Sequence, residues 1–459
     1  MQDIADGACF RRRLRESLSR PETVIALIVT CGFLVNVQQG TDTNAILRDD
    51  PLVFKGIRVL TILLGGSLAV FTVVKRRIPY AICLAGATGS PTRCFAFGNP
   101  MLPFTLYFCS CILSVPYSAY PLLSLFKVCE IGLVVLVCII GITSAVGTPS
   151  DFFNLNVKIV LLYSIIIWVE SFLFPRLAWV QLQGETPLFG HALSGVFPVI
   201  NGNTVGLLGA VLFLAYLPQL VDPPMLRPRS TGPALLGLAS VVCSYSRISL
   251  FGLALAAVCS LVLLRKYALV WAVILCLVLL GTSGRVRTLA VEHLARGQQD
   301  RSLDTFSSHR LEMWDHVLSD YRVSVVGRGY AAGFRYDDDL TTGHAHNSPV
   351  EVYFNVGLFG VVAWLFFIGS VCGRLYQLLK SQATVDGQLV SIVGVTIFML
   401  IKAMGSTVFV YLDASMLILA GIIIYVVRRR AATEPDGLIA SEEHDVSLSY
   451  YDVSQVPRP

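Results

Sequence analysis

Two histidines and an asparagine stand where a polar segment gives way to an apolar one, in the stretch "HAHNSPVEVYFNVGLFG". Histidine is the side chain best able to take up a proton near neutral pH, so His346 is a candidate general base. A histidine considered alone is more often a satisfied polar contact than a catalyst. The residues that follow His346 favour the catalytic interpretation.

A fixed spacing links this histidine to two glycines. Asn347 follows His346 directly, nine further residues precede Gly357, and Gly360 comes three positions later. If a helix begins near Pro349, a residue suited to a first helical turn, the histidine lies just above that helix. Both glycines would then share one face of the helix and let another helix approach closely.

Two arginines are candidates for binding an anionic group. Arg247, in "CSYSRISLFGLA", stands in an apolar context, where a charge is costly unless paired, so it is a functional candidate rather than a snorkelling helix end. Arg310 follows in "SSHRLEMW", together with Trp314. A guanidinium group keeps its charge at any relevant pH and binds phosphate through two parallel hydrogen bonds.

A competing motif lies in "YDDDL", where Asp337 and Asp339 form D-x-D. In nucleotide-sugar enzymes this pattern holds a divalent ion against the substrate. We favour a solvated acidic turn, because the topology derived below places the motif outside the cell, where nucleotide sugars are absent. The 12 cysteines show no zinc-ligand spacing. The sequence therefore predicts neither a metal nor another cofactor.

The elements that must position these residues are membrane-spanning helices. Of the 459 residues, 54% are hydrophobic and 14% charged, whereas soluble globular proteins carry about 25% charged residues. Apolar blocks of about 20 residues, the length that crosses a bilayer as a helix, recur along the chain. We expect an all-α polytopic membrane protein with about twelve spans, near 23–38, 52–74, 101–117, 121–144, 158–175, 203–221, 232–247, 248–265, 267–281, 350–373, 387–406 and 407–427. The stretch 80–99 is a candidate re-entrant segment.

Basic residues follow alternate spans, so the positive-inside rule places both termini in the cytoplasm. The longest external segment holds eight arginines, no lysine, nine acidic residues and five of the seven histidines. Its amphipathic stretches predict helices that lie on the membrane face. The expected divisions are a basic tail at 1–22, spans one to nine at 23–281, a catalytic loop at 282–349, spans ten to twelve at 350–427, and a disordered tail at 428–459.

Together these motifs resemble the O-antigen ligase and polymerase superfamily of membrane glycosyltransferases. The ligase signature is His, then Asn, Ser or Gln, nine residues, Gly, two residues, and Gly, Thr or Tyr. It is matched at each position by His346, Asn347, Gly357 and Gly360. "SYSR" and "SSHRLEMW" look like the two arginine elements of the superfamily, and "VVGRGYAAGF" looks like its Gly-x-Gly turn. The second histidine, His344, departs from the pattern and lacks the correct offset to the glycines.

The resemblance implies a GT-C-like helical fold and a metal-independent transfer from a glycan on undecaprenyl diphosphate, at the periplasmic face of a bacterial inner membrane. His346 would be the base, Arg247 and Arg310 would bind the diphosphate, and Asn347 would orient the histidine or a sugar hydroxyl. Trp314 and the two glycines would support them. The expected partners are the lipid-linked glycan, an acceptor glycan or glycolipid, membrane lipid and other polysaccharide-assembly proteins, with no nucleic acid.

Three functions remain open at this point. A polymerase would extend another lipid-linked chain, whereas a ligase would attach the glycan to lipid A–core. We favour the polymerase, because members that join exported repeat units are widespread and nothing in the sequence is specific for lipid A. A flippase for the same lipid is the alternative of another class. It is disfavoured because transporters often show paired repeats, and none is visible in this sequence.

Overall fold

The computed structural model describes residues 52–75, 99–143, 148–181, 191–196, 199–221, 228–284, 288, 310–311, 313–315, 325–333, 344–382 and 385–433. The expected first span at 23–38, all but the last residue of 80–99, the D-x-D pair Asp337 and Asp339, the N-terminal tail and most of the C-terminal tail lie outside these residues.

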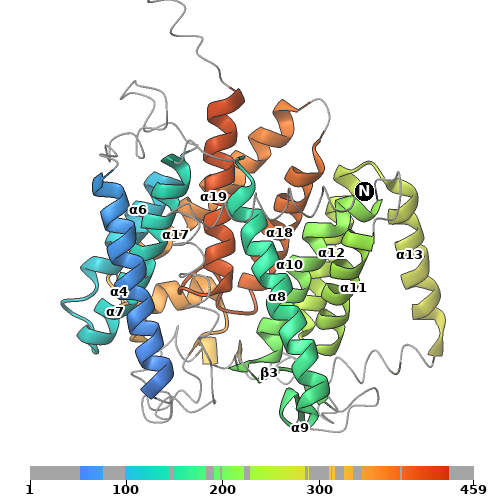
Figure 1. Ribbon diagram of the computed structural model, residues 1–459, viewed down its shortest axis with the longest axis horizontal. Coiled ribbons are helices and arrows are strands. Elements are labelled where there is room, and N and C mark those ends of the chain that lie inside the picture. Colours follow the sequence, from blue (N-terminus) through green and yellow to red (C-terminus); the bar gives the residue numbers. More distant parts are fainter. Residues whose placement is uncertain are drawn as a thin grey trace, which may run out of the picture.

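Apolar helices form the body of the protein (Figure 1). Within the described residues they coincide in position with each expected span from the second to the twelfth. Four are long and apolar enough to cross a membrane, namely α7, α8, α10 and α17. The long helices are α4 (Leu52–Lys75), α6 (Met101–Leu113), α7 (Pro121–Thr143), α8 (Asp151–Leu173), α10 (Gly202–Val221), α11 (Pro228–Cys243), α12 (Arg247–Leu263), α13 (Tyr267–Thr282), α17 (Ser348–Ser381), α18 (Gly387–Ala403) and α19 (Ala414–Thr433).

Two of these helices begin at residues that the sequence analysis did not predict. Helix α8 starts at Asp151 rather than at 158, because the Asp151 carboxylate accepts hydrogen bonds from the Thr148 amide (2.8 Å) and hydroxyl (2.6 Å). Helix α19 starts at Ala414 rather than at 407, because Asp413 accepts a hydrogen bond from the Met416 amide (3.0 Å). A polar N-cap, Asp413, therefore marks the start of α19. At α8 the first-turn residue Asp151 bonds back to Thr148 instead, and hydropathy alone locates neither start.

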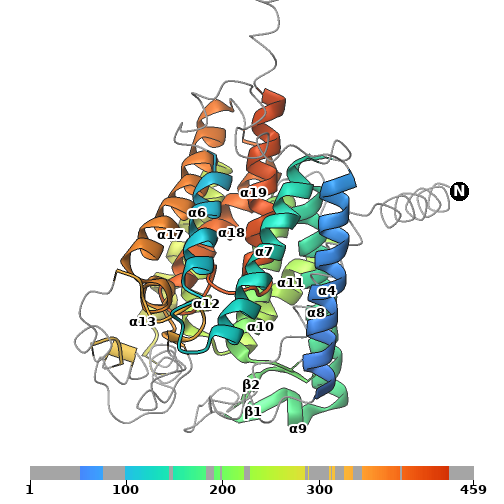
Figure 2. The same cartoon turned by 90° about the vertical axis from the view of Figure 1, so that its left-hand side faces the viewer.

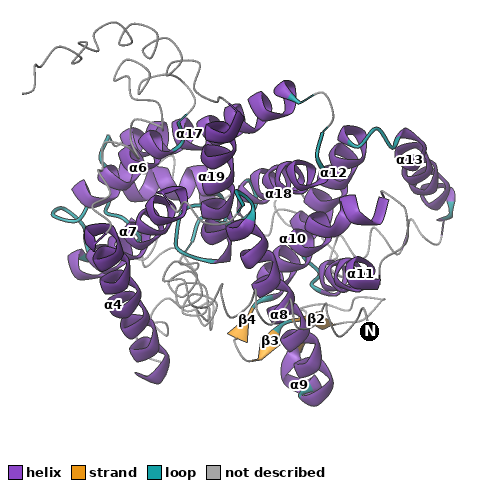
Figure 3. Ribbon diagram, turned by 45° about the horizontal axis from the view of Figure 1, so that its top comes forward, coloured by secondary structure: helices purple, strands orange, loops and turns teal. Residues whose placement is uncertain are grey.

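The helices pack in two groups joined by α8 and α19. Helices α4, α6, α7, α17 and α19 lie on one side, and α10, α11, α12 and α18 lie on the other, with α13 at the edge beside α12 (Figures 1 and 3). Small residues permit the closest crossing. A Cβ at Gly209 of α10 would lie 2.6 Å from the carbonyl oxygen of Gly237 in α11, and the reverse distance is also 2.6 Å. Close backbone contact of this kind is typical of membrane helices.

Helix α17 is broken near its start. Gly357 has φ 72° and ψ −168°, a conformation far from helical. The turns before it run sideways, and the remainder rises with the bundle (Figures 1 and 2). The prediction of one continuous helix, with both glycines on one face, is therefore wrong at Gly357.

Two short hairpins, which were not predicted, stand between α8 and α10 in a fold that otherwise agrees with the all-α prediction. After α9 (Pro175–Ala178), β1 (Trp179–Gln181) pairs antiparallel with β2 (His191–Leu193). β3 (Gly195–Val196) then pairs antiparallel with β4 (Val199–Ile200). Their few residues leave the fold predominantly helical.

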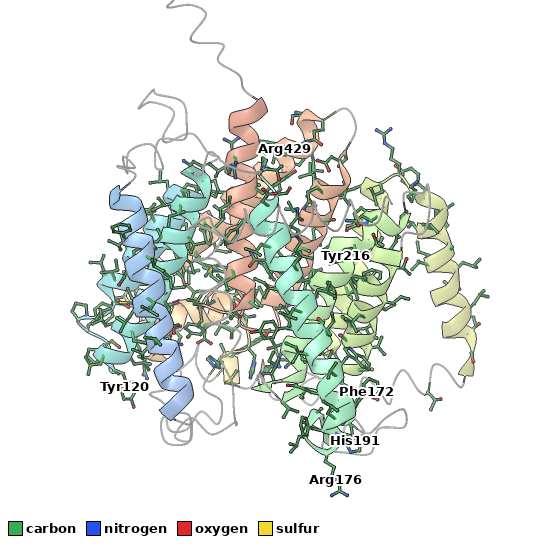
Figure 4. The ribbon with its side chains drawn as sticks, viewed as in Figure 1. Tyr120, Phe172, Arg176, His191, Tyr216 and Arg429 are labelled. Atoms are coloured by element: carbon green, nitrogen blue, oxygen red, sulfur yellow. The ribbon has the colours of Figure 1, made fainter. Side chains whose placement is uncertain are left out.

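The molecule has two chemically distinct ends. At one end Arg429 pairs with Asp386 (3.1 Å) and Arg428 donates to the Thr148 carbonyl (3.3 Å); we name this the basic end. Figure 4 shows Arg429 at that end and Arg176 and His191 at the opposite end. We name the opposite end the site end; among the described residues it comprises 114–120, 174–181, 191–196, 199–201, 244–246, 325–333, 344–348 and 404–413.

Candidate active site

His346 lies at the site end with a strained backbone. Its φ is 51°, in the left-handed region that non-glycine residues seldom occupy. The two peptide groups that flank the preceding residue, Ala345, are both held by hydrogen bonds. The Ala345 amide donates to Glu351 Oε2 (2.6 Å), and the Ala345 carbonyl accepts from Trp314 Nε1 (2.7 Å). The structure thus brings the predicted Trp314 to the histidine segment.

Asn347 caps the helix that follows. Its side-chain oxygen accepts a hydrogen bond from the Val350 amide (3.1 Å), and Pro349 stands in the first turn, as expected. Its amide nitrogen donates to the Met404 carbonyl (3.2 Å). These bonds fix where α17 starts and so help to orient His346. Contact between Asn347 and a sugar hydroxyl stays a prediction.

A non-helical loop, residues 404–413, binds several of the side chains that build the site. The sequence analysis assigned these residues to spans eleven and twelve with a tight turn between them, which is wrong. The loop instead offers its carbonyl groups to side chains from other segments. In each of the following pairs the first residue's carbonyl accepts and the second residue's side chain donates: Met404 with Asn347, Gly405 with Arg310, Ser406 and Val408 with Ser348, Phe409 with Trp364, and Val410 with Tyr330.

Both predicted arginines approach this loop. Arg310 is half-buried and helical, and its Nη1 donates to the Gly405 carbonyl (2.6 Å). Arg247 is half-buried at the first position of α12, where the helix dipole adds positive potential. A Cβ at Gly405 would lie 3.0 Å from Cγ1 of Ile248, the residue after Arg247. The two guanidinium-bearing segments therefore meet around one glycine.

Lys402 is a third basic residue at this position, and it was not among the predicted site residues. Its side chain is buried at the end of α18 and donates to the Asn203 carbonyl (3.0 Å) and to the hydroxyls of Ser246 (3.1 Å) and Ser249 (2.6 Å). Among the described residues, the acceptors that receive these bonds are neutral oxygens. A lysine within an apolar stretch indicates a functional residue by the same reasoning that singled out Arg247.

Glu351 is a second residue that was missed. Its carboxylate is buried in the first turns of α17, accepts a hydrogen bond from the Tyr411 hydroxyl, and lies 3.7 Å from His344 Nδ1. An acidic residue within the apolar run of "SPVEVYFNVGLFG" gave the same unused signal. The second histidine is therefore placed beside the site, in contact with a carboxylate.

The surroundings of His346 keep its imidazole neutral. Burial, followed by the positive charge of Arg310, lowers the pKa of His346 from 6.5 to about 4. His344 and Lys402 act in the same direction, while Glu351 opposes them. At neutral pH the ring is consequently free of the proton that a general base must accept.

The break at Gly357 receives a segment of the preceding loop. The Phe354 and Asn355 carbonyls, freed by the break, accept hydrogen bonds from the amides of Arg328 (3.0 Å) and Gly329 (2.9 Å). A Cβ at Gly357 would lie 2.3 Å from the Val325 carbonyl oxygen. Gly357 thus admits a loop rather than a helix, which corrects its expected role.

Gly360 contacts a helix, as expected. A Cβ there would lie 3.6 Å from Ser110 Oγ of α6.

Backbone strain is concentrated at the site end. Of the five non-glycine residues with positive φ among the described part of the chain, four are there: Tyr245, Ala331, His346 and Phe409. Strained residues cluster at functional sites, so this observation independently points to the same region.

The fold and the site define a multi-pass, mostly helical membrane protein that gathers His344, His346 and three basic residues at one end. A family model described as O-antigen ligase, Wzy_C, matches residues 232–365, which contain Arg247, Arg310 and His346. This match confirms the resemblance to the O-antigen ligase and polymerase superfamily that the motifs indicated. It supports a membrane glycosyltransferase of the ligase or polymerase type in general. No curated protein matched the chain.

Proposed function

We propose that the protein transfers a glycan from undecaprenyl diphosphate to a sugar hydroxyl at the periplasmic face of a bacterial inner membrane. The observation that carries this proposal is the convergence of His346, Arg310 and the start of α12 on the loop 404–413. That arrangement combines a neutral base with fixed positive charge, and glycosyl transfer from a diphosphate needs both.

His346 accepts the proton of the acceptor hydroxyl as the hydroxyl oxygen bonds to the anomeric carbon. The bond between that carbon and the diphosphate oxygen breaks in the same step, and the electron pair leaves with undecaprenyl diphosphate. Such proton transfer contributes about 10²–10⁴-fold to the rate. The negative charge of the diphosphate raises the pKa of His346 above its value in the free protein, which makes the imidazole a stronger base when the donor is bound.

Arg247 and Arg310 bind the diphosphate and stabilise the charge that it gains on leaving. Arginine suits this role because its planar fork matches phosphate oxygens and stays charged. Groups fixed in advance stabilise developing charge without reorganising. The hydrogen bond from Arg310 to Gly405 supports such preorganisation. The oxygens that accept hydrogen bonds from Lys402 are neutral. They therefore do not cancel the charge of its protonated form, which would add to the positive potential beside the two arginines.

One feature supports the orientation, and a second supports the location in a membrane. Arg428 and Arg429 lie at the end opposite to the site, as the positive-inside rule requires if the site faces the periplasm. The exposed apolar side chains of α13, such as Trp271 at 68% exposure, suit contact with lipid. We favour polymerisation of exported repeat units, with ligation to lipid A–core as the alternative acceptor reaction.

A deletion strain tests the proposal and separates these acceptors. Loss of long chains with single repeat units retained supports the polymerase, whereas long lipid-linked chains that never reach lipid A support the ligase. Complementation with His346→Ala or Arg247→Ala should fail although membrane abundance stays normal. His191→Ala is the matched control, because His191 is exposed on β2 and takes part in none of the hydrogen bonds described around His346 (Figure 4). Normal product with His346→Ala contradicts the proposal.

Purified protein separates transfer from transport. Lipid-linked glycan extracted from the deletion strain is the donor, with lipid A–core added in a parallel reaction, and the release of undecaprenyl diphosphate in detergent is the measurement. A glycosyltransferase releases it without a second compartment. A flippase releases none, and that result would support the alternative.

A further inference from the structure

Glu351 emerges from the contacts around the histidine segment rather than from any motif. We propose that Glu351 is a positioning residue that holds His346 in its left-handed conformation. This inference rests on the proposed function and adds a residue to its machinery. The carboxylate acts through the Ala345 peptide and through Tyr411, without touching the substrate.

Hydrogen bonds hold the two peptide groups that flank Ala345. Its amide, in the peptide with His344, donates to Glu351 Oε2 at 2.6 Å, while its carbonyl, in the peptide with His346, accepts from Trp314 Nε1 at 2.7 Å. With both flanking peptides held, the backbone of Ala345 cannot rotate freely, and His346 follows it directly. A positive φ at a histidine costs free energy, so it persists only where its surroundings over-determine it. Glu351 and Trp314 supply that constraint.

The second step is the link from Glu351 to the loop that fills the helix break. Glu351 Oε1 accepts from the Tyr411 hydroxyl, which itself accepts from Asn355 Nδ2 at 2.6 Å. Asn355 Oδ1 in turn accepts from the Gly333 amide at 3.2 Å. A continuous chain of hydrogen bonds therefore runs from the histidine segment to the residues after the Gly-x-Gly turn.

The third step explains why a carboxylate is required. Because Asn355 donates to the Tyr411 oxygen, the Tyr411 proton points to Glu351, and the Ala345 amide also donates to it. Both oxygens of Glu351 must therefore accept. Glutamine offers one acceptor and one donor and cannot serve both partners. The carboxylate is also fully buried, so water cannot replace a lost bond.

Hydrogen exchange tests the position of the histidine segment independently of activity. In Glu351→Gln, measured on the full-length protein in detergent, the Ala345 and His346 amides should exchange about tenfold faster or more, because a charge-assisted hydrogen bond is lost. Glu351→Asp keeps two acceptors and should restore part of the protection. Glu170→Gln is the matched control: Glu170 is also buried, and it accepts the Val196 amide (2.8 Å) in a hairpin outside the site.

Release of undecaprenyl diphosphate from the extracted lipid-linked glycan provides the second measurement. A misplaced base should lower kcat by about 10²-fold, while KM for the lipid-linked glycan stays near the wild-type value, because the arginines are unchanged. The acid limb of the pH profile should move to lower pH, since Glu351 is the group that opposes Arg310, His344 and Lys402 at His346.

The outcomes separate this inference from the proposed function. Unchanged protection of Ala345 together with unchanged kcat in Glu351→Gln overturns the positioning role, even when His346→Ala is inactive. Lost protection in Glu351→Gln with no release by the wild-type protein overturns the proposed function and leaves the clamp established. An equal loss of folded protein in Glu351→Gln and Glu170→Gln assigns Glu351 to general stability and also overturns the proposal.

Discussion

A single imidazole surrounded by cations sets the chemistry at the scale of the residue. Burial and the charge of Arg310 lower the pKa of His346 to about 4, so the ring is neutral at physiological pH. A base with so low a pKa is weak until an anion arrives. The diphosphate is such an anion, which couples binding of the donor to activation of the base.

The pH dependence of transfer follows from this coupling. Activity needs the neutral ring, so it is present above the pKa of His346 and lost as the pH falls through that pKa. The acid limb of kcat/KM, which reports the free protein, should lie below 6.5, and the limb of kcat should lie at higher pH. Arg310→Gln removes a charge that lowers the pKa and should move the kcat/KM limb upward. A downward shift, or no shift, contradicts the assignment of His346 as the base.

Lys402 gives a second prediction at this scale. Lys402→Met removes a buried positive charge beside the proposed diphosphate site and should weaken donor affinity about tenfold, a change of about 1.4 kcal/mol. The measurement is the stabilisation of the purified protein against heating by added undecaprenyl diphosphate. Ser249→Ala is the control, because it removes one hydrogen-bond acceptor of Lys402 and keeps the charge. Equal effects of the two variants would show that anchoring, not charge, matters.

At the scale of the element, a broken helix and two loops build the site together. The break in α17 exposes carbonyls that the segment 325–329 satisfies, and the loop 404–413 satisfies the side chains of the helix start. Buried backbone groups need partners of this kind. The segment 325–329 is therefore docked through the backbone and does not depend on side-chain packing alone.

Gly357→Ala tests the docking. Its φ of 72° and the 2.3 Å distance from a Cβ to the Val325 carbonyl oxygen leave no room for a side chain. The backbone strain alone should cost about 1–3 kcal/mol, and the segment 325–329 should separate from α17. We expect transfer to fall far more than membrane abundance, with faster proteolysis near residue 325. Gly369→Ala, where a Cβ on the same helix meets nothing within 4 Å, should behave as wild type.

At the scale of the whole molecule, the two ends of the helix bundle carry different groups of residues. The site end carries the described histidines His191, His344 and His346, four of the five strained residues and the docked loops, while the basic end carries the Arg429–Asp386 pair. The helices between them hold the ends apart by the length of the bundle. Under the proposed function, the lipid-linked donor would reach the site from the membrane, and the sugar acceptor would reach it from the aqueous side.

Labelling with a membrane-impermeant maleimide tests this arrangement in intact cells. A cysteine at the exposed Asp315 of the site end should react from the periplasm, whereas one at the exposed Ser381, where α17 ends, should react only after permeabilisation. The parent chain, with its own cysteines, gives the background. Reaction of Ser381→Cys alone in intact cells would reverse the orientation and exclude an exported donor.

The sequence by itself determined the helices, the membrane class and the residues most suited to chemistry. Hydropathy and spacing are local properties, so they located the long helices, although not the starts of α8 and α19, and singled out His346, Arg247 and Arg310. Only the tertiary structure decided that α17 breaks at Gly357, that 404–413 is a loop, and that Glu351 and Lys402 face the site. Each of those depends on hydrogen bonds between segments distant in the chain, such as Arg310 with Gly405, and no local pattern encodes such partners.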